Sequence, residues 1–265
     1  MSSDRGATGE GDDRTDGADQ GGAGAPRPAP DDAVLAVEEI TSGYGDVEVL
    51  HDLSMRLFDE EIVCMIGPNG AGKSTVLKTV FGLLQPWSGG IRLLGEDVSG
   101  MAPEDVVRRG VGYVPQIDNV FGSLSVEENL RMGGVSAGGD VDGKIRDLYE
   151  RFPLLDEKSS ERARTLSGGQ QQILAFARAL MTEPHVLLID EPSAGLAPDT
   201  AEDVFERVER INEAGTAIMM VEQNAVAGLG ISDRGYVLDQ GTVRYEGEAD
   251  SLVDDPEVAE LYLGG

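Results

Sequence analysis

Short apolar runs alternate with amphipathic segments along the chain from residue 34 onwards. The runs are rich in Val, Ile and Leu, which is typical of strands, and the shortest resemble strands buried on both faces of a sheet. The predicted strands are residues 34–37, 49–58, 61–66, 89–94, 111–114 and 186–189. Helix-like patterns lie between them, at residues 74–82, 103–109, 126–132, 141–152 and 171–181. This alternation predicts an α/β fold, with a turn at residues 41–46 and a loop at residues 133–140.

The first 33 residues have a different composition from the rest of the chain. They are rich in Gly, Ala, Asp and Pro and contain almost no large apolar side chain. Residues 1–32 carry a net charge of −5, because eight acidic side chains outnumber three arginines. Such a segment cannot bury enough surface to offset its ordering entropy. We therefore predict a disordered acidic tail over residues 1–33 and one domain over residues 34–265.

The 265 residues carry a formal net charge of −28, and only four of the basic residues are lysines. Binding to nucleic acid is disfavoured, because phosphate contacts need a basic face. The acidity favours adaptation to high salt, where screening removes self-repulsion, over a merely acidic cytosolic protein. No secretory signal or apolar span of about 20 residues is present, so we expect a cytoplasmic protein that does not itself cross the membrane. The single cysteine, Cys64, lies in an apolar strand and is expected in the core.

Residues 67–75 read GPNGAGKST and match the phosphate-loop pattern G-x-x-x-x-G-K-[ST] between a predicted strand and a predicted helix. Glycines let several backbone N–H groups point inward at a polyphosphate, and the helix dipole adds to the site. Lys73 would supply a cation near the β and γ phosphates, and Ser74 would ligate magnesium. The predicted loop consists of Gly67, Pro68, Asn69, Gly70, Ala71, Gly72, Lys73, Ser74 and Thr75.

Residues 166–170 read LSGGQ and open the predicted helix over residues 171–181. Small residues at a helix start expose N–H groups to a phosphate, and Ser167 can donate its hydroxyl. An ordinary serine cap followed by a glycine turn is the alternative. Two phosphate-binding segments in one chain are explained if the chain forms a dimer. Each LSGGQ segment would then complete the nucleotide site at the phosphate loop of the other subunit. The residues concerned are Leu166, Ser167, Gly168, Gly169 and Gln170.

The apolar run over residues 186–189 ends in two acids, Asp190 and Glu191. A buried parallel strand delivers such side chains at its carboxyl end, where ligands of open α/β sheets bind. Adjacent strand residues point in opposite directions, so Asp190 and Glu191 can take different roles. Asp190 would hold magnesium through its water shell, and Glu191 would orient or deprotonate the attacking water. Paired acids that are simply solvated are the alternative.

The chain carries GPNGAGKST, Gln116 after a strand, LSGGQ and VLLIDEP in the order and spacing of ATP-binding cassette (ABC) ATPases. It resembles this family over everything after the tail. The resemblance implies a phosphate-loop NTPase of the ABC type, with a mixed β-sheet core, an antiparallel β subdomain and an inserted helical subdomain at about residues 117–166. It further implies ATP hydrolysis with Mg²⁺, and two ATP molecules sandwiched between two such domains.

Two further residues gain roles from the resemblance. Tyr44 precedes the phosphate loop and, considered alone, is either an adenine-stacking ring or an ordinary tyrosine in a turn. Family membership implies stacking on adenine. It also implies that Gln116 contacts magnesium or the attacking water and senses the helical subdomain, which docks on a membrane partner.

Two departures from the family pattern bear on catalysis. Gln223 stands where many relatives carry a switch histidine, and the chain's two histidines lie elsewhere. Its amide can hydrogen-bond a γ-phosphate but cannot carry a proton or a positive charge. Ala197 stands where many relatives have an aspartate that helps to couple two sites. Both departures bear on whether two paired sites hydrolyse ATP equally.

The strings VEQN, DEPSAGLAP, SDRGYVLDQG and the terminal PEVAELYLGG are similar to the ATP-binding subunit of branched-chain amino acid importers that ends in YLGG. Importers of urea and short amides have similar ATPases. The resemblance implies two permease subunits, a second ATPase that is either a sister or another copy, an external solute-binding protein, and a peripheral location on the cytoplasmic face of the membrane. Soluble ABC ATPases of DNA repair or translation and exporter subunits are the alternatives.

Overall fold

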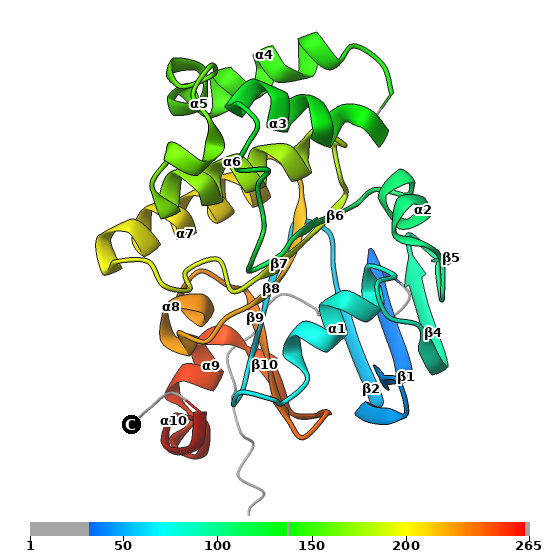
Figure 1. Ribbon diagram of the computed structural model, residues 1–265. Helices are drawn as coiled ribbons and strands as arrows, with labels where there is room; N and C mark the ends of the chain where they lie inside the picture. The colour runs from blue at the N-terminus through cyan, green and yellow to red at the C-terminus, as the bar shows by residue number, and fades with distance from the viewer. Residues whose placement is uncertain (1–31, 137, 263–265) are drawn as a thin grey trace, which may run out of the picture.

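The computed structural model describes residues 32–136 and 138–262. All but the last two residues of the predicted tail therefore lie outside the described residues. The described part consists of a six-stranded sheet, a four-stranded sheet and the helices around them (Figure 1). Among the described residues, no helix is both long enough and apolar enough to cross a membrane.

The six-stranded sheet has the order β10-β9-β3-β8-β7-β6. All of its neighbouring strands are parallel except β10, which pairs antiparallel with β9. The sheet is thus mixed, as the resemblance implied. Its strands are β3 (Ile62–Ile66), β6 (Val111–Val114), β7 (Val186–Asp190), β8 (Ala217–Val221), β9 (Arg234–Asp239) and β10 (Thr242–Glu248).

The second sheet is antiparallel, with the order β2-β1-β4-β5. Its strands are β1 (Leu35–Tyr44), β2 (Val47–Leu57), β4 (Pro86–Leu93) and β5 (Glu96–Asp97). The turn predicted at residues 41–46 is wrong, because β1 continues through Tyr44 and only Gly45 and Asp46 form the turn. Gly45 adopts a φ of 58°, so two residues suffice to reverse the chain. The structure thus contains the antiparallel sheet that the family resemblance implied.

The helices are α1 (Lys73–Val80), α2 (Pro103–Arg108), α3 (Val126–Gly133), α4 (Val141–Arg151), α5 (Pro153–Glu157), α6 (Gly168–Leu180), α7 (Pro198–Glu213), α8 (Ala225–Gly230), α9 (Ala249–Asp254) and α10 (Pro256–Tyr262). Short 3₁₀ turns lie at Gly134–Ser136 and Ala163–Thr165. The predicted helix over residues 171–181 begins three residues earlier, at Gly168, because Ser167 caps it.

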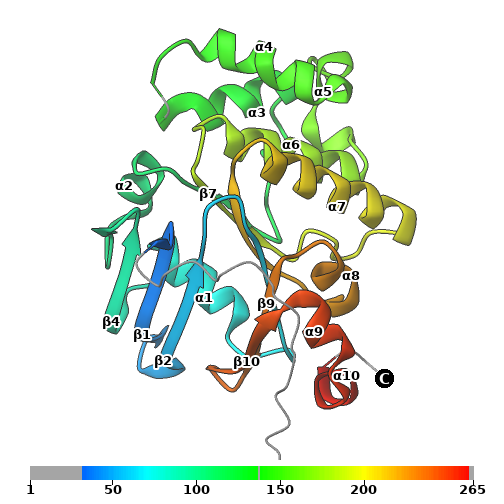
Figure 2. The same cartoon turned by 180° about the vertical axis from the view of Figure 1, so that it is seen from behind.

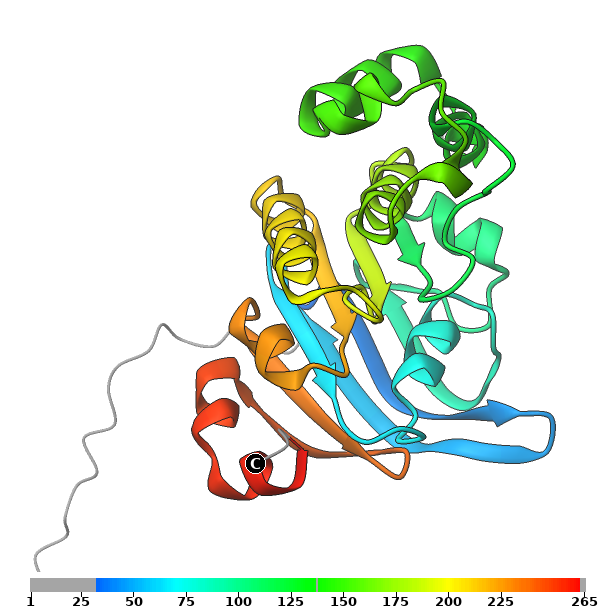
Figure 3. The same ribbon diagram turned by 60° about the vertical axis from the view of Figure 1, so that its left-hand side comes forward.

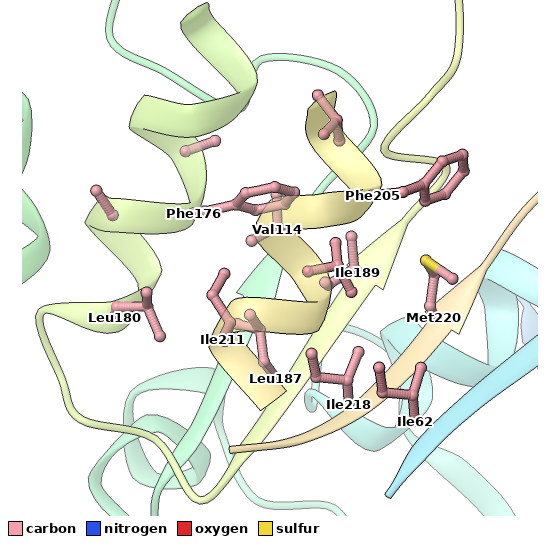
Figure 4. Packing of buried hydrophobic residues seen from close by; sticks show 14 of the residues in the cluster. Ile62, Val114, Phe176, Leu180, Leu187, Ile189, Phe205, Ile211, Ile218 and Met220 are labelled. Atoms are coloured by element: carbon pink, nitrogen blue, oxygen red, sulfur yellow. The ribbon is translucent and has the colours of Figure 1, made fainter. Parts of the chain in front are cut away.

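Alternate residues of the parallel strands face two different cores. In β3, Cys64 belongs to the core cluster that includes residues of α6 and α7, whereas Val63 and Met65 belong to the cluster that includes residues of α1 and the antiparallel sheet. Figure 4 shows the first core, where the aromatic and aliphatic side chains of α6 and α7 cover strands β3, β7 and β8. Cys64 is fully buried, as predicted, and burial raises the pKa of its thiol. A sheet covered on both faces leaves its strand ends as the place for a site.

Helices α3, α4 and α5 gather at one end of the molecule, above α6 (Figures 1 and 3). Residues 126–155 contribute Val126, Leu130, Ile145, Leu148, Phe152 and Leu155 to the core that contains α6. Helices α8, α9 and α10 lie together at the opposite end (Figure 2).

Candidate functional site

Four segments with predicted functional residues meet at the carboxyl edge of the parallel strands. The phosphate loop follows β3, the two acids end and follow β7, Gln223 follows β8, and Gln116 follows β6. Strand β8 lies between β3 and β7, and its last residue, Val221, is in register with Met65 on one side and Asp190 on the other. The edge therefore brings together residues that are more than 100 positions apart in the sequence.

Three glycines give the phosphate loop its shape. Gly67, Gly70 and Gly72 have φ values of 144°, 84° and 104°, a region that disfavours other residues. At Gly67 a Cβ atom would lie 2.1 Å from the backbone oxygen of Leu238, so only glycine fits. Helix α1 begins directly after Gly72 with no side-chain cap. Its first N–H groups are thus left for a ligand, and the site suits an anion.

Lys73 lies at this helix start and is only 5% exposed. Its ammonium donates to the backbone oxygens of Gly67 at 2.8 Å and Pro68 at 3.2 Å. Burial lowers the pKa of Lys73, while the charges of Glu191 and Asp190 raise it. The cation is therefore held over the loop and beside both acids, where a bound polyphosphate would need it.

Asp190 is 4% exposed and forms hydrogen bonds with two neighbouring hydroxyl groups. Ser74 Oγ donates to its Oδ1 at 2.9 Å, and the Tyr113 hydroxyl donates to its Oδ2 at 3.4 Å. Burial raises the pKa of Asp190, and the hydrogen bond from Ser74 lowers it. Tyr113 was not predicted from the sequence as a site residue. Its position in β6, the strand next to β7, was the signal that could have placed it near Asp190.

The oxygen atoms of Ser74 and Asp190 fit a magnesium site. Ser74 Oγ and Asp190 Oδ1 lie 2.9 Å apart as hydrogen-bond partners, and oxygen atoms are the ligands that Mg²⁺ takes. Within the described ranges, no group of three or more His, Cys, Asp and Glu residues could hold a metal ion. A site with few protein ligands suits Mg²⁺, which usually retains waters and binds substrate phosphates.

Glu191 departs from the strand that carries it. Its φ is 47°, and its N–H donates to Val221 at 2.9 Å. Glu191 therefore adopts a left-handed conformation directly after the end of β7, so the strand alternation that the sequence suggested does not extend to it. Gln116 Nε2 donates to Glu191 Oε2 at 2.6 Å. Burial raises the pKa of Glu191, Lys73 lowers it and Asp190 raises it. A carboxylate in this setting suits a general base.

The segment after β8 contains an exposed amide and a buried acid. Gln223 is exposed and borders a cavity of about 560 Å³ together with Ser193 and Pro198. Glu222 is 1% exposed and was not singled out from the sequence. The signal was present, because β8 is a uniformly apolar strand followed directly by an acid, much as β7 ends in one.

The LSGGQ segment forms the start of α6, away from the loop contacts described above. Ser167 accepts a hydrogen bond from the N–H of Gln170 at 3.3 Å, and the Gln170 side chain accepts from the N–H of Ser167 at 3.1 Å. A Cβ atom on Gly169 would lie 2.4 Å from the Thr200 methyl group, so α6 and α7 meet closely here. Among the described residues, no hydrogen bond or ion pair joins residues 166–170 to residues 67–75.

Tyr44 lies at the end of β1, and 45% of its surface is exposed. The Lys78 ammonium of α1 is 5.9 Å from the centre of its ring. The ring therefore stands beside the helix that follows the phosphate loop, with a free surface for a ligand. Its stacking on adenine stays a prediction.

A phosphate loop between a parallel strand and a helix, with a Ser–Asp pair and a second acid beside it, defines a P-loop nucleotide-binding ATPase. The family model for the ABC transporter matches residues 50–194, which include the phosphate loop, LSGGQ and both acids. The chain belongs to the ABC transporter family, whose ATP-binding cassettes hydrolyse ATP.

Relatives of known name cover nearly the whole domain. The high-affinity branched-chain amino acid transport ATP-binding protein BraG of Pseudomonas aeruginosa is 42% identical, over 88% of this chain and 100% of its own length. The probable branched-chain amino acid transport ATP-binding protein LivF of Archaeoglobus fulgidus is 36% identical, over 87% and 99%. The crystal structure of the ADP conformation of MJ1267, an ATP-binding cassette of an ABC transporter, matches with a TM-score of 0.79 at 28% identity, over 88% and 99%.

Proposed function

We propose that this chain is the ATP-binding and ATP-hydrolysing subunit of an ABC importer that takes up branched-chain or related amino acids through membrane permeases. The observation that carries the proposal is the match to BraG, which spans 100% of that relative at 42% identity. The branched-chain transport relative from Archaeoglobus fulgidus gives independent support. Substrate selectivity would then reside in the permeases and in an external solute-binding protein.

The site residues divide the work of ATP hydrolysis. The loop of residues 67–75, which includes Lys73, binds the phosphates of ATP, and Tyr44 stacks on the adenine of ATP. Ser74, Gln116 and Asp190 would hold magnesium, and the ion would supply neutralisation of the charge on the phosphate oxygens. The short hydrogen bond between Gln116 and Glu191 supports a shared role at the attacking water.

Glu191 accepts the proton of the attacking water, which the raised pKa of a half-buried carboxylate favours. The side-chain amide N–H of Gln223 donates a hydrogen bond to the γ-phosphate. An amide cannot shuttle a proton, so Glu191 is the group that carries the base role in this chain.

Each ATP-binding site is completed by residues 166–170 of a second ATPase subunit, which is either another copy of this chain or a related sister chain. The exposed position of Ser167 and Gly168 at the start of α6 supports this, because no hydrogen bond among the described residues joins residues 166–170 to the phosphate loop of the same chain. Residues 34–265 form the ATPase domain, and the helices of residues 117–166 dock on a permease. The chain then lies peripherally on the cytoplasmic face of the membrane, where ATP closes and hydrolysis reopens the ATPase pair.

The test is to purify the chain in mild detergent at high salt from membranes of the cells that make it, and to identify its partners by mass spectrometry. We expect two permeases and an ATPase related to this chain or identical with it. Recovery outside the membrane fraction, with ribosomes, DNA or no partner, would contradict the importer and favour a non-transport ABC ATPase.

A further inference from the structure

Glu222 is a carboxylate buried directly after β8, and its oxygens link two loops. Ser193 donates to it twice, from its N–H at 2.9 Å to Oε1 and from its hydroxyl at 2.9 Å to Oε2. The N–H of Gln223 donates to Oε2 at 3.1 Å. These donors belong to the loop after β7 and to the loop after β8. A single side chain therefore ties together two segments that are about 30 positions apart.

Both tied segments lead to residues with proposed roles in hydrolysis. Ser193 is two positions after Glu191, and the N–H of Ala194 returns to the backbone oxygen of Glu191 at 3.1 Å. The same loop continues to Leu196, whose side chain lies 3.0 Å from where a Cβ of Gly168 would be. Gln223 follows Glu222 directly. The Glu222 carboxylate thus supports the loop that follows Glu191 and reaches α6, and it also supports the backbone of Gln223.

Burial makes this link specific. Only 1% of Glu222 is exposed, which excludes an ordinary solvated acid. A Cβ atom on Gly228 would lie 2.9 Å from the Glu222 Cβ, so the stem of the side chain is tightly enclosed. Burial raises the pKa of Glu222, and the bonds from Ser193 lower it. A buried acceptor that lost its donors would pay its full desolvation penalty, which favours one arrangement of both loops.

We propose that Glu222 is a positioning residue that fixes the loop after Glu191 and the backbone of Gln223 in the geometry needed for ATP hydrolysis. The proposal rests on the roles given above to Glu191 and Gln223. Glu222 itself touches no phosphate. Its contribution is to the rate of the chemical step and not to the binding of ATP, because its side chain bonds to Ser193 and Gln223 and, among the described residues, makes no hydrogen bond to residues 67–75.

The experiment measures kcat and KM for ATP of the full chain with magnesium in excess. Glu222→Gln keeps the shape of the side chain but turns an N–H₂ group toward the Ser193 and Gln223 donors. We expect kcat to fall about tenfold and KM to stay within about twofold. Unchanged kcat would overturn the proposal, as would a fall accompanied by a comparable rise in KM.

Glu61→Gln is the matched control. Glu61 is also buried, at 8% exposed, accepts from the N–H of Phe58 at 2.8 Å and pairs with Arg234 at 3.1 Å. It precedes the amino end of β3, at the edge of the sheet opposite the site. Both variants remove a buried charge, but we expect Glu61→Gln to keep kcat within about twofold. An equal fall in kcat for both would reduce the Glu222 effect to general destabilisation and overturn the proposal.

Ser193→Ala keeps the test decisive if Glu222→Gln does not fold. It removes only the hydroxyl donor, and we expect kcat to fall about threefold at constant KM. Wild-type kcat in that variant would overturn the proposal. In a double-mutant cycle, Ser193→Ala combined with Gln223→Ala should cost less than the product of the single effects, because Glu222 links both loops.

Full multiplicative effects in that cycle would contradict the link. If Gln223→Ala alone leaves kcat unchanged, the role proposed for the Gln223 amide fails, while the Glu222→Gln and Ser193→Ala results still decide whether Glu222 positions the loop after Glu191.

Discussion

The phosphate-loop region and the LSGGQ region look alike in sequence but differ in structure. Both are small-residue segments at a helix start. Helix α1 has no side-chain cap, and its first turn is linked to Asp190 by the hydrogen bond from Ser74. Helix α6 is closed by a reciprocal capping box between Ser167 and Gln170. The first segment is built into a network on its own chain, and the second is complete as a helix cap.

This difference indicates where each region acts. A loop that awaits an anion, with a buried lysine and two acids beside it, can bind a nucleotide within one chain. A capped helix start that shares no hydrogen bond with that loop adds nothing to the site within the described chain. Its glycines pack against Leu196 and Thr200, which explains their small size without a nucleotide. We infer that any role of LSGGQ toward ATP is exerted on another subunit.

The largest effect is expected at Lys73. Lys73→Ala removes the cation held over the loop, and we expect ATP affinity of the single chain to fall at least about 100-fold. Isothermal titration calorimetry with Mg-ATP measures this. Lys158→Ala is the control, because Lys158 pairs with Glu161 and, among the described residues, makes no ion pair with the phosphate loop or the two acids. Retained ATP binding in Lys73→Ala would contradict the claim that the phosphate-loop region binds the nucleotide within one chain.

Glu191→Gln separates binding from chemistry in the same region. We expect turnover to fall at least about 100-fold while ATP binding persists, so that an ATP-bound dimer accumulates. Steady-state hydrolysis and size-exclusion chromatography with ATP check both parts. Glu206→Gln, on the exposed face of α7, should hydrolyse ATP normally. Undiminished hydrolysis by Glu191→Gln would refute its assignment as the base.

Gln223→Ala should have a milder effect than Glu191→Gln. The role proposed for its amide is a single hydrogen bond to the γ-phosphate, so we expect a loss of about tenfold in turnover. The same hydrolysis assay ranks the two variants. Equal losses would mean that the amide is as essential to the chemistry as the acid.

The smallest effect concerns the whole surface. A net charge of −28 repels itself most at low ionic strength. We expect the midpoint of thermal unfolding to rise by about 5 °C or more between low and molar KCl. Differential scanning calorimetry measures it, with a near-neutral protein of similar size as the control. Equal midpoints at both salt concentrations would reject salt adaptation.

The sequence predicted the parts of the site that depend on local chemistry. Uniformly apolar runs gave the buried strands β3, β6 and β7, and the glycine pattern gave the loop after β3. Residues at the carboxyl ends of these strands meet because parallel strands share one edge. That rule needs only the strand assignment, so the joint position of Lys73, Asp190 and Glu191 could be predicted.

Other features depend on tertiary contacts that no local pattern reveals. The left-handed φ of Glu191 is fixed by its bond to Val221 in the neighbouring strand. The role of Glu222 depends on Ser193, which lies 29 positions earlier in the chain. The turn at residues 41–46 was misplaced because Thr41 and Ser42 resemble loop residues, although both pair within the antiparallel sheet. Pairing between strands overrode local preference there.

The most direct test of the comparison is Ser167→Arg with Ser125→Arg as its control. Both serines cap a helix through the same reciprocal box, so both variants lose one cap of similar strength. ATP affinity is measured on the dilute chain, and turnover on the assembled ATPase pair. We predict that Ser167→Arg binds ATP like the wild type but loses turnover, while Ser125→Arg retains both. Loss of ATP affinity in dilute Ser167→Arg would place LSGGQ in its own chain's site and contradict the account.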